Sequence, residues 1–115
     1  MLLDFNRMPS QTWSEFKGGA GDTVVRMYKD VSNRIMFMKL EPGSSIDYHR
    51  HEDSSEIIYV MQGTATGTYD GVEEIIEPGM CGYCPAGHSH GIENKGDEDL
   101  VFFSVVSEKQ ANQTL

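Results

Sequence analysis

The stretch GSSIDYHRHEDSSEIIYVMQG, residues 43–63, is the most informative part of this chain. It sets His49 and His51 two residues apart, so in an extended strand both imidazoles leave the same face. Glu56 follows five residues later, directly ahead of the strand-like run at 57–60. One imidazole pair and one carboxylate can therefore converge on a single point.

A second stretch, GMCGYCPAGHSHGIEN at residues 79–94, adds an imidazole at His90 on another predicted strand. The two spacings are G-x5-H-x-H-x4-E-x6-G and G-x5-P-x-G-x2-H-x3-N. Both resemble the two signature motifs of the cupin superfamily at every defining position, and the short segment between them is similar to that of small single-domain bacterial cupins. The resemblance implies an all-β fold, the double-stranded β-helix or jelly-roll barrel also called RmlC-like. It further implies four metal ligands, His49, His51, Glu56 and His90.

The chemistry of these four side chains limits the metal. Neutral imidazole nitrogens and one carboxylate oxygen suit a borderline divalent transition metal. We expect one such ion per chain, and the residue types leave Mn, Fe, Ni, Co and Zn open. The cupin pattern also implies two adjacent coordination positions that stay open to water or substrate. The alternative is that each residue is an ordinary polar group on a strand surface, which a lone histidine would favour.

His88 lies two residues before His90 and should point to the same side of an extended strand. It is therefore the candidate catalytic residue, as a general acid or base beside the metal. The alternative is a histidine at the solvent rim of the barrel. Three basic side chains are candidates for holding an anionic substrate through charge-assisted hydrogen bonds, and the sequence leaves open which of them faces the pocket: Arg26, Arg34 and Lys39.

Short apolar runs predict strands at residues 23–28, 34–40, 57–60, 64–69, 72–76 and 100–106. Without a long helical pattern between them, they predict an antiparallel sandwich or barrel, which the resemblance narrows to a jelly roll. We divide the chain into an N-terminal arm at 1–21, a cupin barrel at 22–107 and a polar tail at 108–115. Residues 10–16 of the arm are expected to form one helical turn or an irregular segment. Small cupins often exchange such an arm, so the resemblance implies a homodimer.

Length and charge limit the partners. A chain of 115 residues has room for about one domain. Its net charge of −9, without a Lys/Arg cluster, argues against nucleic acid as a partner. No apolar run is long enough for a membrane span, and the start MLLDFNRMPS does not resemble a signal peptide. We therefore expect a cytoplasmic protein without a membrane partner.

Cys81 and Cys84 form a C-x-x-C pattern. In a redox enzyme this spacing belongs at a helix start in a βαβ unit, which is not predicted here. Residues three apart on a strand face opposite ways, so a disulfide between them is poorly placed. We expect reduced thiols, with a catalytic thiol as the alternative.

Three functions are compatible with a metal in such a barrel. The leading hypothesis is a small metalloenzyme of the dioxygenase, isomerase, decarboxylase or lyase type that acts on a small oxygenated molecule. The alternative is a non-catalytic cupin that binds a small carboxylate or sugar in the barrel. The third is a structural site closed by tetrahedral zinc. A titratable group within reach of a metal-bound substrate would favour the enzyme.

Overall fold

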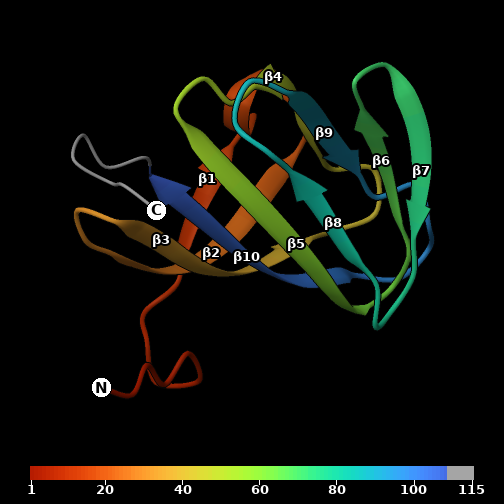
Figure 1. Cartoon of the computed structure of the whole chain (residues 1–115). Coiled ribbons are helices and arrows are strands. Elements are labelled where there is room, and N and C mark those ends of the chain that lie inside the picture. Colours follow the sequence, from red (N-terminus) through yellow and green to blue (C-terminus); the bar gives the residue numbers. More distant parts are fainter. Residues whose placement is uncertain (109–115) are drawn as a thin grey trace.

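The computed structural model describes residues 1–108, which form two antiparallel β-sheets facing each other (Figure 1). The predicted polar tail lies outside the described residues except for Glu108, which ends the last strand. The elements in chain order are β1 (Gln11–Ser14), the short 3-10 helix η1 (Phe16–Gly18), β2 (Asp22–Lys29), β3 (Asn33–Leu40), β4 (Ser45–Arg50), β5 (Ser54–Gln62), β6 (Ala65–Tyr69), β7 (Val72–Ile76), β8 (Cys81–Cys84), β9 (Ser89–Glu93) and β10 (Leu100–Glu108).

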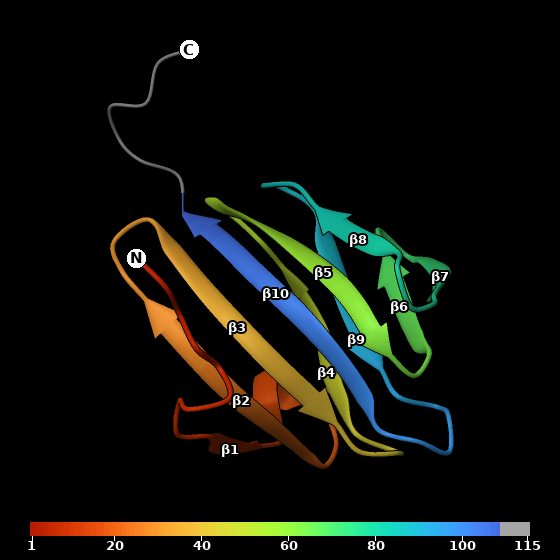
Figure 2. The ribbon, with the colours of Figure 1, turned by 90° about the horizontal axis from the view of Figure 1, so that it is seen from below.

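The strand order confirms the predicted jelly roll. One sheet has the order β1-β2-β3-β10-β5-β8 and the other has the order β4-β9-β6-β7. Figure 2 shows β2, β3, β10, β5 and β8 lying side by side, with the second sheet beyond them. The six runs predicted from the sequence lie in strands, apart from Thr64, which immediately precedes β6. Within residues 1–108, no helix is long and apolar enough to cross a membrane.

Strand β10 holds the larger sheet together because it pairs with β3 along one side and with β5 along the other. Alternate residues of β10 turn inward, and Leu100, Phe102, Ser104 and Val106 are all buried. This period of two is what an antiparallel strand with one face on a core requires. Ser104 is polar in this otherwise apolar row, and it lies next to the candidate site.

The N-terminal arm differs from the prediction. The helical turn expected within residues 10–16 is wrong, because Gln11–Ser14 forms β1 and pairs with β2 of the same chain. A helix of one turn satisfies few of its own backbone groups, whereas the edge of β2 offers partners to a strand. The large side chains of Trp13 and Phe16 then pack on the core of this chain.

One irregularity in the four-stranded sheet determines where the histidines point. Ile46 pairs with Ile92 and His49 pairs with His90, so β4 advances three residues where β9 advances two. The extra residue is a β-bulge. Residues three apart on a regular strand face opposite ways, but here Ile46 and His49 both line the space between the sheets.

The bulge is tightly packed against Gly91 of β9. A Cβ atom on Gly91 would lie 3.0 Å from both the N and the Cα atom of Tyr48, within the bulged segment. The backbone of β4 can therefore approach β9 this closely only where β9 has no side chain.

We expect Gly91→Ala to lower the free energy of unfolding by about 1–3 kcal/mol, because its methyl group would press on the Tyr48 backbone. Denaturant unfolding of the metal-free protein measures this change. Gly96→Ala is the control: its Cβ would meet only the Asn94 side chain, at 3.4 Å, and we expect a change within about 0.5 kcal/mol. Equal stability of Gly91→Ala and wild type would contradict the close approach.

Candidate metal centre

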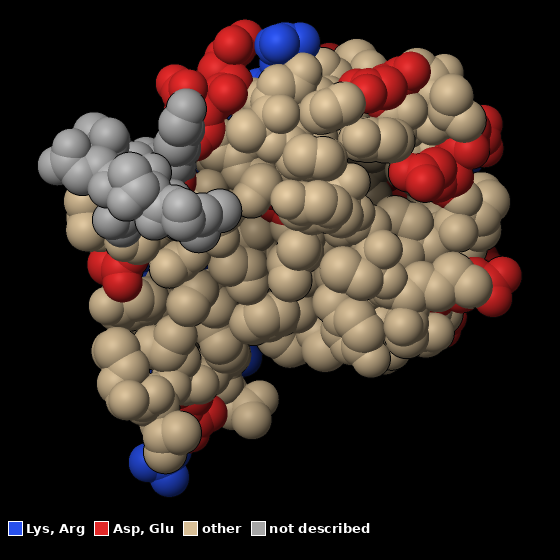
Figure 3. All heavy atoms as spheres, viewed as in Figure 1, with Lys and Arg blue, Asp and Glu red and all other residues tan. Residues whose placement is uncertain are grey.

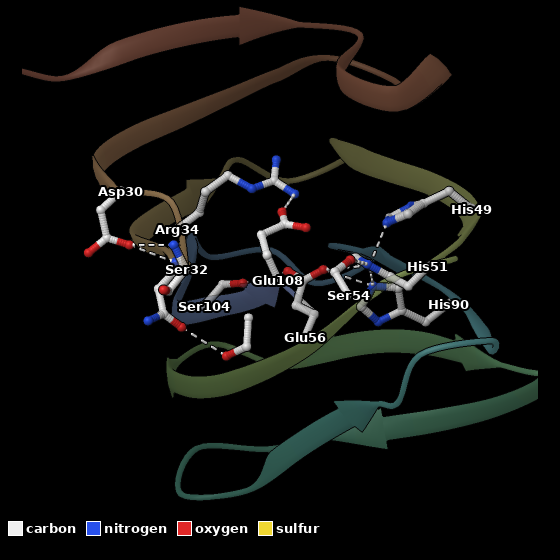
Figure 4. Close-up of polar contacts among 12 residues, drawn as sticks. Asp30, Ser32, Arg34, His49, His51, Ser54, Glu56, His90, Ser104 and Glu108 are labelled. Atoms are coloured by element: carbon white, nitrogen blue, oxygen red, sulfur yellow. Dashed lines mark hydrogen bonds and ion pairs between the residues drawn. The ribbon is translucent and has the colours of Figure 1, made fainter. Parts of the chain in front are cut away.

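Four side chains from three strand regions converge between the sheets (Figure 4). His49 comes from β4, His51 from the residue after β4, Glu56 from β5 and His90 from β9. One potential ligand atom from each lies within 4.8 Å of all the others. The two stretches that the sequence singled out are thus brought to one point, as predicted.

The distances within the cluster are short. The Nε2 atom of His51 lies 3.1 Å from Nε2 of His49, 3.1 Å from Nε2 of His90 and 3.0 Å from Oε1 of Glu56. The Nε2 atom of His90 is also 3.0 Å from Glu56 Oε1. A neutral imidazole nitrogen carries at most one proton, so His51 Nε2 cannot make a hydrogen bond to all three neighbours at once. A cation between these atoms would satisfy all of them.

The same distances fit a particular arrangement of ligands. Around an ion about 2.1 Å from each donor atom, neighbours at right angles are about 3.0 Å apart and tetrahedral neighbours are about 3.4 Å apart. The observed 3.0–3.1 Å separations match the right-angled arrangement. Three imidazole nitrogens and a carboxylate oxygen could therefore hold a divalent transition metal, and the closed tetrahedral zinc site is the poorer fit.

Further contacts fix the orientation of the candidate ligands. The Nδ1 atom of His49 donates to the backbone carbonyl of Asp47 at 2.8 Å, which leaves a lone pair on Nε2 facing the cluster. His51 Nδ1 lies 2.8 Å from Ser54 Oγ. Contacts of this kind commonly fix the tautomer of metal-binding histidines.

The Ser104 hydroxyl holds Glu56 from the other side. It donates to the Glu56 Oε2 atom at 2.5 Å, so the carboxylate presents Oε1 to the imidazoles. Ser104 is completely buried in β10. Sequence reasoning missed this residue, and its only signal was a serine at an inward position of an apolar strand.

The pKa shifts of two of the four donors, Glu56 and His49, favour the protonation states that a metal requires. Burial alone would raise the pKa of Glu56, but hydrogen bonds from His51, His90 and Ser104 outweigh it and hold this pKa well below the usual range. Burial lowers the pKa of His49, since the charged imidazolium would be poorly solvated. At neutral pH a carboxylate thus faces a neutral His49 imidazole, as metal binding demands.

The cluster lies at the wall of a narrow pocket between the sheets, with a free volume of about 30 Å³. Apolar side chains such as Met36, Met38 and Val106 form much of the wall. Two basic residues also line it, Arg34 from β3 and Lys17 from η1. Such a pocket suits a small ligand with polar groups at one or both ends.

The three predicted anion-binding candidates have separate positions. Arg34 lines the pocket. Arg26 instead donates from Nη1 to the backbone carbonyl of Phe5 at 2.8 Å, and Lys39 is not among the lining residues. Sequence reasoning missed Lys17, because its place at the pocket depends on how the arm folds back and on a left-handed backbone conformation with φ of 57°.

His88, the candidate catalytic residue, does not line this pocket. Its Nδ1 atom lies 2.5 Å from Asp70 Oδ2, its ring stacks on Tyr69, and its side chain is 43% exposed. Asp70 belongs to the tight turn between β6 and β7. This position matches the alternative of a histidine at the solvent rim, and the geometry gives the catalytic role no support.

The two cysteines are free thiols, as expected. Cys81 is exposed, whereas Cys84 is buried opposite Glu56 in the pairing of β8 with β5. Burial raises the pKa of the Cys84 thiol to about 11, and the nearby Glu56 carboxylate adds to this effect. The Cys84 thiol is thus protonated at neutral pH and unsuited to act as a nucleophile.

The fold agrees with comparisons to known proteins. The family model described as "Cupin domain" matches residues 36–106. The oxalate-binding protein of Thermotoga maritima is 32% identical over 114 residues, which cover 92% of this chain and 93% of that protein. The crystal structure of a predicted oxalate decarboxylase from Thermotoga maritima superposes with a TM-score of 0.88 at 30% identity, over 94% of this chain and 99% of that one.

A longer relative shares only a domain-sized part. Oxalate decarboxylase OxdC of Bacillus subtilis is 31% identical over 108 residues, which cover 86% of this chain but 28% of that enzyme. The structure of KdgF from Halomonas sp. has the same fold, with a TM-score of 0.80 at 17% identity over 97% of this chain and 96% of that one. Because the family model spans more than half of the sequence, this chain belongs to the cupin family.

Proposed function

We propose that this cupin binds one divalent transition metal through His49, His51, Glu56 and His90, and that the metal and the pocket together bind a small carboxylate such as oxalate. The observation that carries the proposal is the convergence of four donor atoms at the wall of a pocket that also contains Arg34. The relatives named for oxalate binding and oxalate decarboxylation support the choice of ligand.

The side chains around the site favour binding over catalysis. Among the described residues that line the pocket, the titratable groups outside the four donors are Lys17 and Arg34. Arginine stays protonated and cannot exchange protons with a substrate, although it suits a carboxylate well. With Lys17 as the one side chain among these described residues that could exchange a proton, the pocket is better equipped to hold an anion than to transform it.

A metalloenzyme is the second candidate. The right-angled spacing of the donor atoms favours a site with positions left for a ligand, and OxdC is a decarboxylase. A bound metal would act as a Lewis acid toward the ligand oxygens. The pocket side chains would orient the ligand and exclude water. A catalytic role for His88 remains a prediction, and so does a location in the cytoplasm.

We also propose that the chain forms a homodimer through the outer face of the larger sheet. Outward residues of β3, β10, β5 and β8 form two apolar rows across the strands. The rows are Phe37, Phe103, Tyr59, Cys81 and Ile35, Val105, Ile57, Tyr83. The ring of Phe5 packs on Phe37 and Phe103 and covers part of the first row. An antiparallel sheet with a solvated outer face normally carries polar residues there. Figure 3 shows that this face is largely free of charged side chains, although the chain carries a net charge of −9. Two equally charged copies would repel each other least across such a face.

The metal ligands can be tested by metal content. We expect wild-type protein, purified without an affinity tag and incubated with Mn, Fe, Ni, Co or Zn salts, to hold about one ion per chain. His51→Ala removes a donor that contacts the other three, so metal affinity should fall at least about 100-fold. Elemental analysis after desalting measures both. His88→Ala is the matched control and should keep its metal, and equal loss in both variants would contradict the assignment.

Ligand binding is tested by calorimetry with oxalate. We expect the manganese-loaded protein to bind one oxalate per chain with a dissociation constant below about 1 mM, and metal-free protein to bind none. Oxalate recovered unchanged after prolonged incubation in air would support a binding protein. Release of carbon dioxide would favour the enzyme instead, and no binding by loaded protein would overturn both.

The dimer is tested by light scattering coupled to size-exclusion chromatography. Wild type should elute with twice the chain mass. Tyr59 and Tyr83 are 42% and 58% exposed, so changing both to glutamate should cause little damage to the fold but place charges in the apolar interface. This variant should be monomeric. Val72→Glu, at an apolar position of β7 that is 65% exposed, should remain dimeric, and a dimeric double variant would refute this interface.

A further inference from the structure

Arg34 has an unsatisfied hydrogen-bond donor at the pocket. Its Nε atom is buried and has no hydrogen-bond partner within the described part of the chain. A buried donor without an acceptor costs free energy, and nearly all such groups in proteins are paired. An oxygen atom of an anionic ligand in the pocket would supply the missing acceptor.

The strand register places Arg34 near the candidate metal centre. Arg34 pairs with Val106 of β10, and Val106 pairs with Glu56 of β5, so Arg34 and Glu56 lie two strands apart in one row. Neighbouring strands are about 4.8 Å apart, which puts the two backbones about 10 Å apart. Both residues line the same pocket. One small molecule could therefore contact the metal ligands at one end and the Arg34 guanidinium at the other.

Glu108 occupies one end of this guanidinium. Its Oε1 atom lies 3.5 Å from Arg34 Nη2, longer than a normal hydrogen bond, and its side chain is 40% exposed (Figure 4). The Glu108 backbone is held separately, since its N–H donates to the Ser32 carbonyl at 2.7 Å. The carboxylate can thus leave Arg34 without disturbing β10. A partly exposed ion pair of this length is weak.

We propose that Arg34 selects dicarboxylates by binding the carboxylate farther from the metal, and that Glu108 competes for the same guanidinium when no ligand is bound. This inference rests on the proposed function, because the nearer carboxylate would be held at the metal. A guanidinium presents parallel N–H donors to a carboxylate in a paired geometry, which an ammonium group does not. A monocarboxylate would lack the group that Arg34 recognises.

Lys17 and Arg26, the other cations considered, are less suited to this role. Lys17 is exposed at the mouth, with its ammonium 5.6 Å from the centre of the Phe16 ring. Arg26 holds the carbonyl of Phe5. Arg26 therefore provides a matched control, an arginine of the same sheet that is not part of the pocket lining.

The test compares oxalate with acetate by calorimetry on manganese-loaded wild type, Arg34→Gln, Arg34→Lys, Glu108→Gln and Arg26→Gln. Arg34→Gln should weaken oxalate binding about 10- to 100-fold and change acetate binding less than about threefold, with metal content unaltered. Arg34→Lys should lie between Arg34→Gln and wild type. Glu108→Gln should strengthen oxalate binding several-fold, because it removes the competing carboxylate. Arg26→Gln should match wild type.

The outcomes separate this inference from the proposed function. If Arg34→Gln keeps its metal and binds oxalate as wild type does, Arg34 selectivity is overturned while metal-dependent binding stands. An equal loss of affinity for oxalate and for acetate would also overturn Arg34 selectivity, because Arg34 would then contribute to the binding of any carboxylate. If loaded wild type binds no oxalate, both fail. Glu108→Gln leaves Arg34 in place, so its tighter binding supports the inference even if the Arg34 variants fold poorly.

Discussion

The pairing of β4 with β9 through a single bulge is the constraint on which the site depends. With a regular register, Ile46 and His49 could not face the same side, and either the apolar wall or the first histidine would be lost from the pocket. The bulge is possible because Gly91 lets the Tyr48 backbone approach. The same contact thus organises both the core packing of the smaller sheet and the chemistry at its edge.

The four donor side chains are arranged to hold a cation, and this arrangement costs the folded protein free energy when no cation is bound. Four donor atoms face one another at close range, and the buried Glu56 carboxylate is held charged by hydrogen bonds that outweigh its desolvation. Ser104 and the Asp47 carbonyl fix the two ends of this arrangement from outside. Groups preorganised in this way bind a metal without first having to move, which is why such supporting contacts matter as much as the ligands.

Charge is distributed unevenly in this acidic protein. The chain has eighteen acidic and nine basic residues, yet the pocket beside the candidate centre is lined by Arg34 and Lys17. Positively charged side chains within an acidic molecule are the feature of this pocket that the proposed anionic ligand would use. The apolar outer rows of the larger sheet are a second departure from an ordinary surface, and they suit a protein partner of the same kind.

The sequence by itself determined the four candidate ligands, the strand-rich fold and the family, because motif spacing and a period of two are local properties that survive without tertiary structure. It could not determine which basic residue reaches the pocket, that Ser104 orients Glu56, or that His88 turns toward Asp70. Those facts depend on strand register, on the bulge and on the way the arm folds back over the barrel, where residues far apart in the chain meet. Local pattern fixes which face a side chain takes on a regular strand, but only the assembled sheets decide what that face meets.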